Sequence, residues 1–83
     1  ILRIDTLNNL KINESGVVIG NEVKGDNRQN IINLGFSNGA RVKCLYFSPF
    51  GDPVAYLVKD VIVALRQEDS KNIIVMRDIS GSY

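Results

Sequence analysis

Few side chains in this sequence could carry out catalysis. The 83 residues contain no histidine, the side chain that most often acts as a general base and as a metal ligand. Ser37, Ser48, Ser70 and the single cysteine, Cys44, therefore have no histidine to activate them as nucleophiles. Activation of a serine by a lysine is the one route to such chemistry that the composition leaves open. We therefore expect a protein that is not an enzyme.

Metal binding would have to rely on carboxylates and on Cys44. Asp52, Asp60, Glu68 and Asp69 could converge in space, but their spacing matches no EF-hand, paired-cysteine or histidine–glutamate motif. A lone buried thiol usually packs as a small apolar side chain. The sequence therefore leaves the metal ligands unknown and predicts, at most, weak binding of Fe²⁺ or another divalent transition metal.

Three segments have the properties of a recognition surface. In the first, Leu34–Val42, the helix is expected to end at Gly35, so that the exposed helix end and Phe36 could form a docking surface. The loop Ser48–Pro53 contains a glycine and two prolines, which predict a rigid connection that loses little entropy on binding. Arg66 ends a predicted strand, and its guanidinium could pair with a carboxylate or phosphate of a partner. An architectural role is the alternative in each case. The residues that we expect to contact a partner are Phe36, Gly51, Asp52, Pro53 and Arg66.

Composition places the chain among ordinary globular domains. Its residues are 45% hydrophobic and 23% charged, which suits one domain, 1–83, with a thin core. Ten basic residues against nine acidic ones give a net charge of +1, without the basic excess of a nucleic-acid binder. No apolar run approaches the roughly 20 residues that span a bilayer. No signal peptide is recognisable, and the lone cysteine suits the reducing cytosol, so we expect a cytoplasmic protein.

The elements that must position these residues are predicted to be mainly strands. Ten Ile and nine Val outnumber seven Leu, and β-branched side chains pack well in sheets. One strand alternates so that Val42, Cys44 and Tyr46 share a face. Lys59 and Asp60 separate two apolar runs and predict a tight type I′ turn, whose positive φ angles suit Asp60 better than Lys59. The five expected strands are 17–23, 41–48, 54–58, 61–65 and 73–76.

One short helix is expected over residues 27–34. Asp26 and Gln29 have the spacing of a capping box, and Gly35 suits the left-handed residue that follows a helix. A further helical turn is expected at Gln67–Lys71, between two strands. Five strands in so short a chain predict a small closed or half-closed barrel, because an open sheet would leave long unpaired edges.

A series of short motifs runs along most of the chain, from about Leu7 to Val75. The motifs are Leu7-Asn8-Asn9-Leu10-Lys11 with Glu14-Ser15-Gly16, Leu34-Gly35-Phe36 with Gly39, Gly51-Asp52-Pro53, Ala64-Leu65-Arg66-Gln67-Glu68-Asp69, and Ile73 with Val75. Their order and spacing resemble the FeoA family of ferrous iron transport proteins. One departure is Asp60, which stands where a hairpin glycine is usual in the family and should strain that turn slightly.

The resemblance to the FeoA family implies an SH3-like β-barrel with a short helical insertion. It also implies a non-catalytic accessory or regulatory protein of bacterial ferrous iron uptake, associated with transition metal ions. The expected partner is the cytosolic region of FeoB, the GTP-dependent iron transporter. Through that partner the protein would lie in the cytoplasm at the inner membrane.

Other functions stay open. Domains of this type also occur in metal-dependent transcriptional repressors, so the chain could be the metal-responsive domain of such a repressor, with a DNA-binding region upstream of Ile1. It could also be a weak intracellular iron carrier that uses oxygen ligands shared between subunits. Because exposed barrel edges can pair between copies, a homo-oligomer is compatible with each of these functions.

Overall fold

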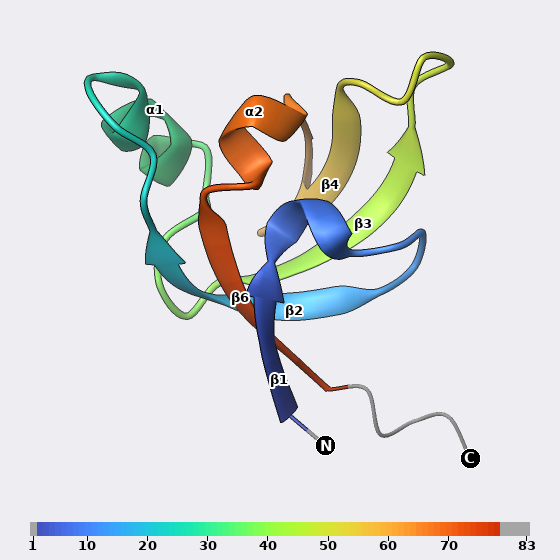
Figure 1. Cartoon of the computed structure of the whole chain (residues 1–83), viewed down its shortest axis with the longest axis horizontal. Helices are drawn as coiled ribbons and strands as arrows, with labels where there is room; N and C mark the ends of the chain where they lie inside the picture. Colours follow the sequence, from blue (N-terminus) through green and yellow to red (C-terminus); the bar gives the residue numbers. More distant parts are fainter. Residues whose placement is uncertain (1, 79–83) are drawn as a thin grey trace.

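A computed structural model of the chain describes residues 2–78, which form a mainly β domain with three short helical segments (Figure 1). Within this range every helix is too short or too polar to traverse a lipid bilayer. The elements are, in order, β1 (Leu2–Thr6), the 3-10 helix η1 (Leu7–Asn9), β2 (Ser15–Asn21), α1 (Asn27–Asn33), β3 (Arg41–Phe47), β4 (Val54–Val58), β5 (Val61–Leu65), α2 (Gln67–Ser70) and β6 (Ile73–Asp78).

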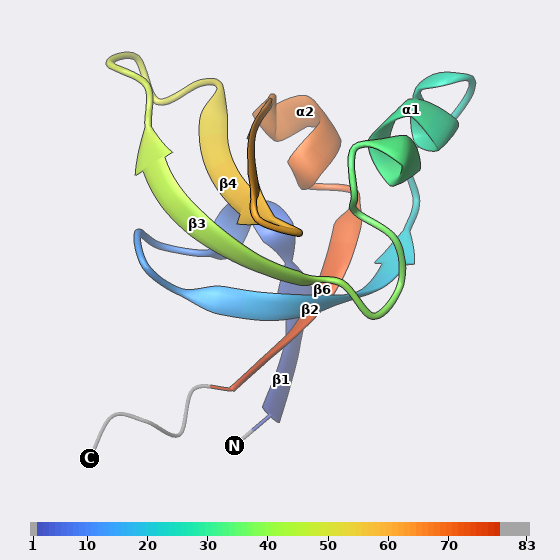
Figure 2. The same cartoon turned by 180° about the vertical axis from the view of Figure 1, so that it is seen from behind.

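All six strands belong to one antiparallel sheet, in the order β1-β6-β2-β3-β4-β5. The sheet curls strongly, so that β4 and β6 rise on opposite sides of α2 (Figures 1 and 2). Helix α1 lies at the periphery, in the connection between β2 and β3. The curl produces a small barrel, which confirms the predicted fold class.

The strand count differs from the prediction, because β1 is a sixth strand. It forms one edge of the sheet and pairs with β6 from Leu2 opposite Asp78 to Thr6 opposite Ile74. The segment does alternate, but its apolar side chains point to solvent, and Leu2 and Ile4 are 66% and 63% exposed. The side chain of Asp5 lies on the other face and is half-buried. A search for strands whose apolar side chains face the core therefore does not find this edge strand.

The hairpin between β4 and β5 is confirmed residue for residue. Both strands have the predicted bounds, and Val58 lies directly opposite Val61. Lys59 and Asp60 have φ angles of 51° and 64°, so both occupy the left-handed region that a type I′ turn requires. The chain therefore accepts a positive φ at a lysine here, where glycine or asparagine is more usual.

Strand β3 contains an irregularity that changes which side chains face the core. Cys44 lies opposite Tyr56 and Tyr46 lies opposite Ala55, so Leu45 is one extra residue on β3. The extra residue turns the strand, and the side chain of Tyr46 is 55% exposed although that of Cys44 is wholly buried. The prediction that Val42, Cys44 and Tyr46 share one face is therefore wrong.

Helix α1 has nearly its predicted bounds but a different start. Asp26 is itself in a helical conformation, with φ −67° and ψ −25°, and its side chain makes no capping hydrogen bond. The side-chain amide of Gln29 donates to Asn33 Oδ1 at 3.0 Å instead of reaching back to the helix start. The predicted capping box is therefore wrong, because Asp26 has already entered the helical turn. Short helix α2 falls within the predicted turn.

The core lies inside the curled sheet and is closed by residues that follow α1. Phe36 is fully buried and packs edge-to-face on Tyr56, with ring centroids 6.2 Å apart. Gly35 makes this packing possible, since its φ is 121° and a Cβ there would lie 3.2 Å from Val58 Cγ2. The sharp turn after α1 thus requires glycine for both its backbone angle and its close approach to β4.

Candidate functional site

The loop between β3 and β4 is fastened to the start of α2, although about 15 residues separate the two along the chain. The Gln67 backbone N–H donates to Asp52 Oδ1 at 2.9 Å, and the Gln67 side-chain amide donates to the Gly51 carbonyl at 2.7 Å. A carboxylate that accepts a backbone N–H in the first turn caps a helix and favours its dipole. The structure therefore brings Gly51 and Asp52 beside Arg66, as a single surface.

Internal hydrogen bonds hold the loop in one shape. The Gly51 N–H donates to the Ser48 carbonyl at 2.8 Å, and the Ser48 N–H donates to the Pro53 carbonyl at 3.1 Å. Gly51 has a φ of 84°, which favours glycine. The loop is thus closed by its own backbone and attached to α2 by Asp52, which is the rigidity predicted from its composition.

The exposed side chains of this surface are those that could meet a partner. Asp52 and Pro53 are exposed, and Gly51 is half-buried. The Arg66 side chain is 73% exposed and forms a 3.3 Å ion pair with Glu68 on the surface. Such an exposed pair contributes little stability, so the guanidinium can exchange it for a partner's carboxylate at small cost.

Phe50, which the sequence prediction omitted, is the most exposed large apolar side chain in residues 2–78, at 97%. It lies at the tip of the loop, next to Gly51. Tyr46 and Phe47, at the end of β3, are 55% and 43% exposed, so three of the chain's six Phe and Tyr residues lie at this end of the hairpin. The sequence could have indicated this exposure, because Phe50 lies in a Pro-Phe-Gly turn and not in a strand that would bury its ring.

Phe36 does not belong to this surface. Its side chain has no exposed area and is held against Tyr56 in the core. A partner could reach it only if the domain opened. The expectation that Phe36 is exposed is therefore wrong, because the residue after Gly35 turns inward and not toward solvent.

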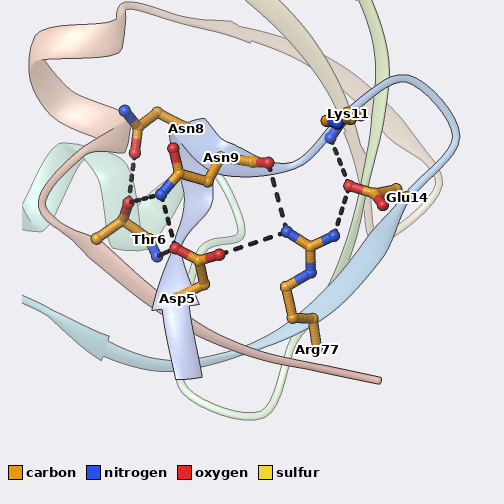
Figure 3. Close-up of polar contacts among 7 residues, drawn as sticks. All are labelled: Asp5, Thr6, Asn8, Asn9, Lys11, Glu14 and Arg77. Carbon is orange, nitrogen blue, oxygen red and sulfur yellow. Dashed lines mark hydrogen bonds and ion pairs between the residues drawn. The ribbon is translucent and has the colours of Figure 1, made fainter. Parts of the chain in front are cut away.

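A second group of polar side chains surrounds Arg77, on β6 beneath η1 (Figure 3). Arg77 Nη2 lies 2.6 Å from Glu14 Oε1, and Arg77 Nη1 lies 3.4 Å from Asp5 Oδ2. Arg77 Nη1 also donates to the Asn9 carbonyl at 3.4 Å. The group ties β6 to β1, to η1 and to the segment that leads into β2.

The carboxylates around Arg77 are all occupied by neighbours. Asp5 Oδ1 accepts from the Asn9 side chain at 2.7 Å and from the Thr6 N–H at 2.8 Å. These bonds, Asn9 first, together with the charge of Arg77 lower the pKa of the Asp5 carboxyl below its ordinary value of 3.8. Glu14 Oε1 also accepts from the Lys11 N–H at 2.8 Å. The group is therefore a structural tie and presents no vacant carboxylate to a ligand.

Residues 2–78 contain no group of three or more His, Cys, Asp or Glu side chains that could hold a metal ion. Asp52 caps α2, whereas Asp60 lies in the turn at the other end of β4. Cys44 is fully buried, and burial, followed by the nearby charge of Glu14, raises the pKa of its thiol. The carboxylates that could have converged therefore do not, and the thiol packs as an apolar side chain.

The FeoA domain family matches residues 6–77. A Fe(2+) transport protein A/Fe(2+) transporter FeoB fusion protein of Porphyromonas gingivalis is 33% identical over 67 residues. That match covers 81% of this chain, which in turn spans only 8% of the length of the fusion protein.

Several solved structures share the fold, including a FeoA protein and a transcriptional repressor. The FeoA of Stenotrophomonas maltophilia, complexed with zinc and described as a prokaryotic SH3 domain protein, is 28% identical with a TM-score of 0.72, covering 84% of this chain and 87% of that one. A manganese-dependent transcriptional repressor has a TM-score of 0.80 at 15% identity, covering 94% of this chain and 44% of that one. The second likeness is one of fold alone. The barrel is SH3-like, as the resemblance to the FeoA family implied.

Proposed function

The chain belongs to the FeoA family, and we propose that it is a non-catalytic binding module that assists or regulates ferrous iron uptake by docking on the cytosolic region of FeoB. The fusion protein of Porphyromonas gingivalis carries this proposal, because there a segment like this chain shares a polypeptide with the transporter. Joining two proteins in one chain raises their effective concentration to about the millimolar range for a short linker, which suits a contact that is weak by itself. The proposed location follows from the partner: the cytoplasm, at the inner membrane.

The surface that we assign to this docking consists of Phe50, Gly51, Asp52, Pro53 and Arg66, called the loop surface below. It combines an exposed aromatic ring with an exposed guanidinium, and aromatic and arginine side chains are enriched among the residues that dominate protein interfaces. Its backbone is already held by hydrogen bonds, so little conformational entropy is lost on binding.

The members of the loop surface have different roles in this proposal. Phe50 inserts its ring into an apolar depression of the partner, and Arg66 pairs with a partner carboxylate. Asp52 acts indirectly, because its Oδ1 already accepts the Gln67 N–H and so holds the loop against α2. Gly51 supplies a backbone angle that other residues rarely adopt.

The test is a titration of the ¹⁵N-labelled domain with the cytosolic region of the matching transporter. We expect localised amide shifts in 48–53 and 66–69, and a double variant, Phe50→Ala with Arg66→Ala, that binds at least about tenfold more weakly. Ile62→Ala with Lys71→Ala is the matched control, because both side chains are exposed and lie outside the loop surface. A folded double variant with unchanged affinity would remove the loop surface from the proposal. Absence of any shift would remove docking on the cytosolic region.

A second candidate is the metal-responsive domain of a transcriptional repressor. The likeness to the manganese-dependent repressor, over 94% of this chain, favours it at the level of fold. The gene distinguishes the two: a DNA-binding helical region encoded directly upstream of Ile1 would support the repressor, and a FeoB reading frame in the same operon would support the transporter.

A further inference from the structure

A groove with a cationic rim lies at the end of the β3–β4 hairpin opposite the loop surface. It has a volume of about 340 Å³ and is open to solvent. Ser15, Lys43 and Leu57 lie in one row across β2, β3 and β4, since Ser15 pairs with Lys43 and Lys43 with Leu57. The residues that line the groove are Ser15, Arg41, Lys43, Leu57, Lys59 and Asp60.

The lining belongs to the outer face of the sheet. Val42 and Cys44 on β3, and Val58 on β4, point into the core. Because neighbouring residues of a strand face opposite sides, Lys43 and Leu57 point outward. Both are half-buried, which places an apolar floor beneath a charged rim.

Positive charge is concentrated here far beyond the chain's net charge of +1. Arg41, Lys43 and Lys59 face the groove with only Asp60 to oppose them. Within residues 2–78 the ion pairs lie elsewhere, at Arg66 and Arg77, and Lys59 Nζ donates only to the Ser37 hydroxyl at 3.4 Å. Three cations that share one cavity repel one another, and a bound anionic group would relieve that repulsion.

We propose that this groove, called the cationic groove below, binds an acidic segment of a partner protein, with carboxylates on Arg41, Lys43 and Lys59 and an apolar side chain on Leu57. The fork of an arginine matches a carboxylate with two hydrogen bonds, and lysine supplies a mobile point charge. The volume is at the lower end of the about 300–1,000 Å³ of ligand pockets, so it accommodates one apolar side chain of a bound segment.

An acidic protein segment fits these observations better than a nucleic acid does. No aromatic side chain lines the groove, so bases would have no ring on which to stack. The domain as a whole also lacks the basic excess that phosphate backbones require. The cationic groove and the loop surface are separate, so this proposal does not depend on the proposed docking of the loop surface.

The test uses three capped pentapeptides, DELDE, NQLNQ and DEGDE, titrated into the ¹⁵N-labelled domain. We expect DELDE to shift the amides of Ser15, Lys43, Leu57 and Asp60, NQLNQ to have no effect, and DEGDE to bind more weakly because it lacks the apolar side chain. Added salt should weaken the binding of DELDE, since exposed charges are screened within roughly 10 Å at 0.1 M ionic strength.

Variants that remove the same charge at different positions distinguish specific binding in the cationic groove from non-specific electrostatic attraction to the domain. Lys43→Gln with Lys59→Gln should weaken DELDE binding about fivefold to tenfold. Lys24→Gln with Lys71→Gln removes the same charge from exposed positions outside the groove and should leave it unchanged. Phe50→Ala with Arg66→Ala should also leave it unchanged, which keeps this test separate from that of the loop surface.

Four results would overturn the proposal. The first is the absence of localised shifts at about 5 mM DELDE, where even a millimolar complex is mostly formed. The second is equal weakening by the Lys24 and Lys71 control. The third is an equal response to inorganic phosphate or stronger binding of a DNA or RNA oligonucleotide, which would assign the groove to phosphates. The fourth is a shift of the same amides with protein concentration alone, which would assign the groove to a second copy of the chain.

Discussion

Replacing Arg77 by methionine tests whether the polar group beneath η1 holds the N-terminal part of the domain in place (Figure 3). Methionine keeps an unbranched stem of similar reach and removes the charge and all hydrogen-bond donors of the guanidinium. The substitution breaks the ion pairs with Glu14 and Asp5 and the hydrogen bond to the Asn9 carbonyl. The variant therefore isolates the ionic tie from the packing of the side chain.

The expected cost follows from how far the group is buried. The Arg77 side chain is 12% exposed, and those of Asp5 and Glu14 are 21% and 37% exposed. An exposed pair contributes about 0–1 kcal/mol, and breaking a fully buried one costs about 3–5 kcal/mol. This intermediate case should cost about 2 kcal/mol of unfolding free energy, which lowers the melting temperature by roughly 8–16 °C in a domain of this size.

The difference between the two proteins should also depend on pH. The pKa of Asp5 in the folded state is below its ordinary value, first because of the Asn9 hydrogen bond and then because of the Thr6 N–H and Arg77. A lowered carboxyl pKa contributes stability that is complete above the unfolded pKa, near 4, and is lost as the pH falls through the folded value. The variant retains the contributions of Asn9 and Thr6 but not that of Arg77. Its deficit should therefore shrink in acid.

The measurement is urea unfolding of both proteins near neutral pH and again in acid, below the ordinary carboxyl pKa. Arg66→Met is the control, because it removes a second arginine–carboxylate pair that is exposed, and it should cost less than about 0.5 kcal/mol. A cost below about 0.5 kcal/mol for Arg77→Met would refute the reasoning from burial. A cost that does not change with pH would refute the assigned ion pairs.

Three further predictions concern the fold and the loop surface. Gly35→Ala should cost about 2–3 kcal/mol in thermal unfolding, because its φ is 121° and a Cβ would meet Val58; Gly25→Ala, with φ 72° in open space, should cost about 1 kcal/mol. Equal costs would contradict the role of Val58. Asp52→Ala should remove the cap of α2, cost about 1 kcal/mol and speed amide hydrogen exchange in 67–70; unchanged exchange would exclude the cap. Cys44 should react with a thiol reagent only as fast as the domain opens, because it is buried and burial raises its pKa, so fast reaction of the native protein would contradict its placement.

Local patterns predicted the parts of the fold that depend on neighbouring residues. The turn at Lys59–Asp60 follows from its spacing between two apolar runs, and helix α2 follows from the polar segment between two strands. The capping box failed, although its spacing was right. The reason is the backbone of Asp26, which is already helical, so its side chain does not have the geometry of a helix cap.

The parts that could not be predicted depend on contacts between distant residues. Strand β1 exists because β6 pairs with it from the other end of the chain, and its apolar side chains remain in solvent. Phe36 is buried because its ring packs against Tyr56. Nothing in the sequence near Phe36 indicates this contact. For the candidate site, composition predicted a rigid loop and suggested Arg66 as a contact residue, whereas the link through Gln67 required the fold.

The pairing of Leu2 with Asp78 has a consequence for how this domain can be combined with others. It places the free ends of β1 and β6 side by side, whereas the loop surface lies at the far side of the barrel (Figures 1 and 2). A tether at either end would leave the barrel from the same place, on the side away from the loop surface. A longer protein could therefore carry this domain at its N-terminus, at its C-terminus or between two other segments. In each case the loop surface would face away from the point of attachment.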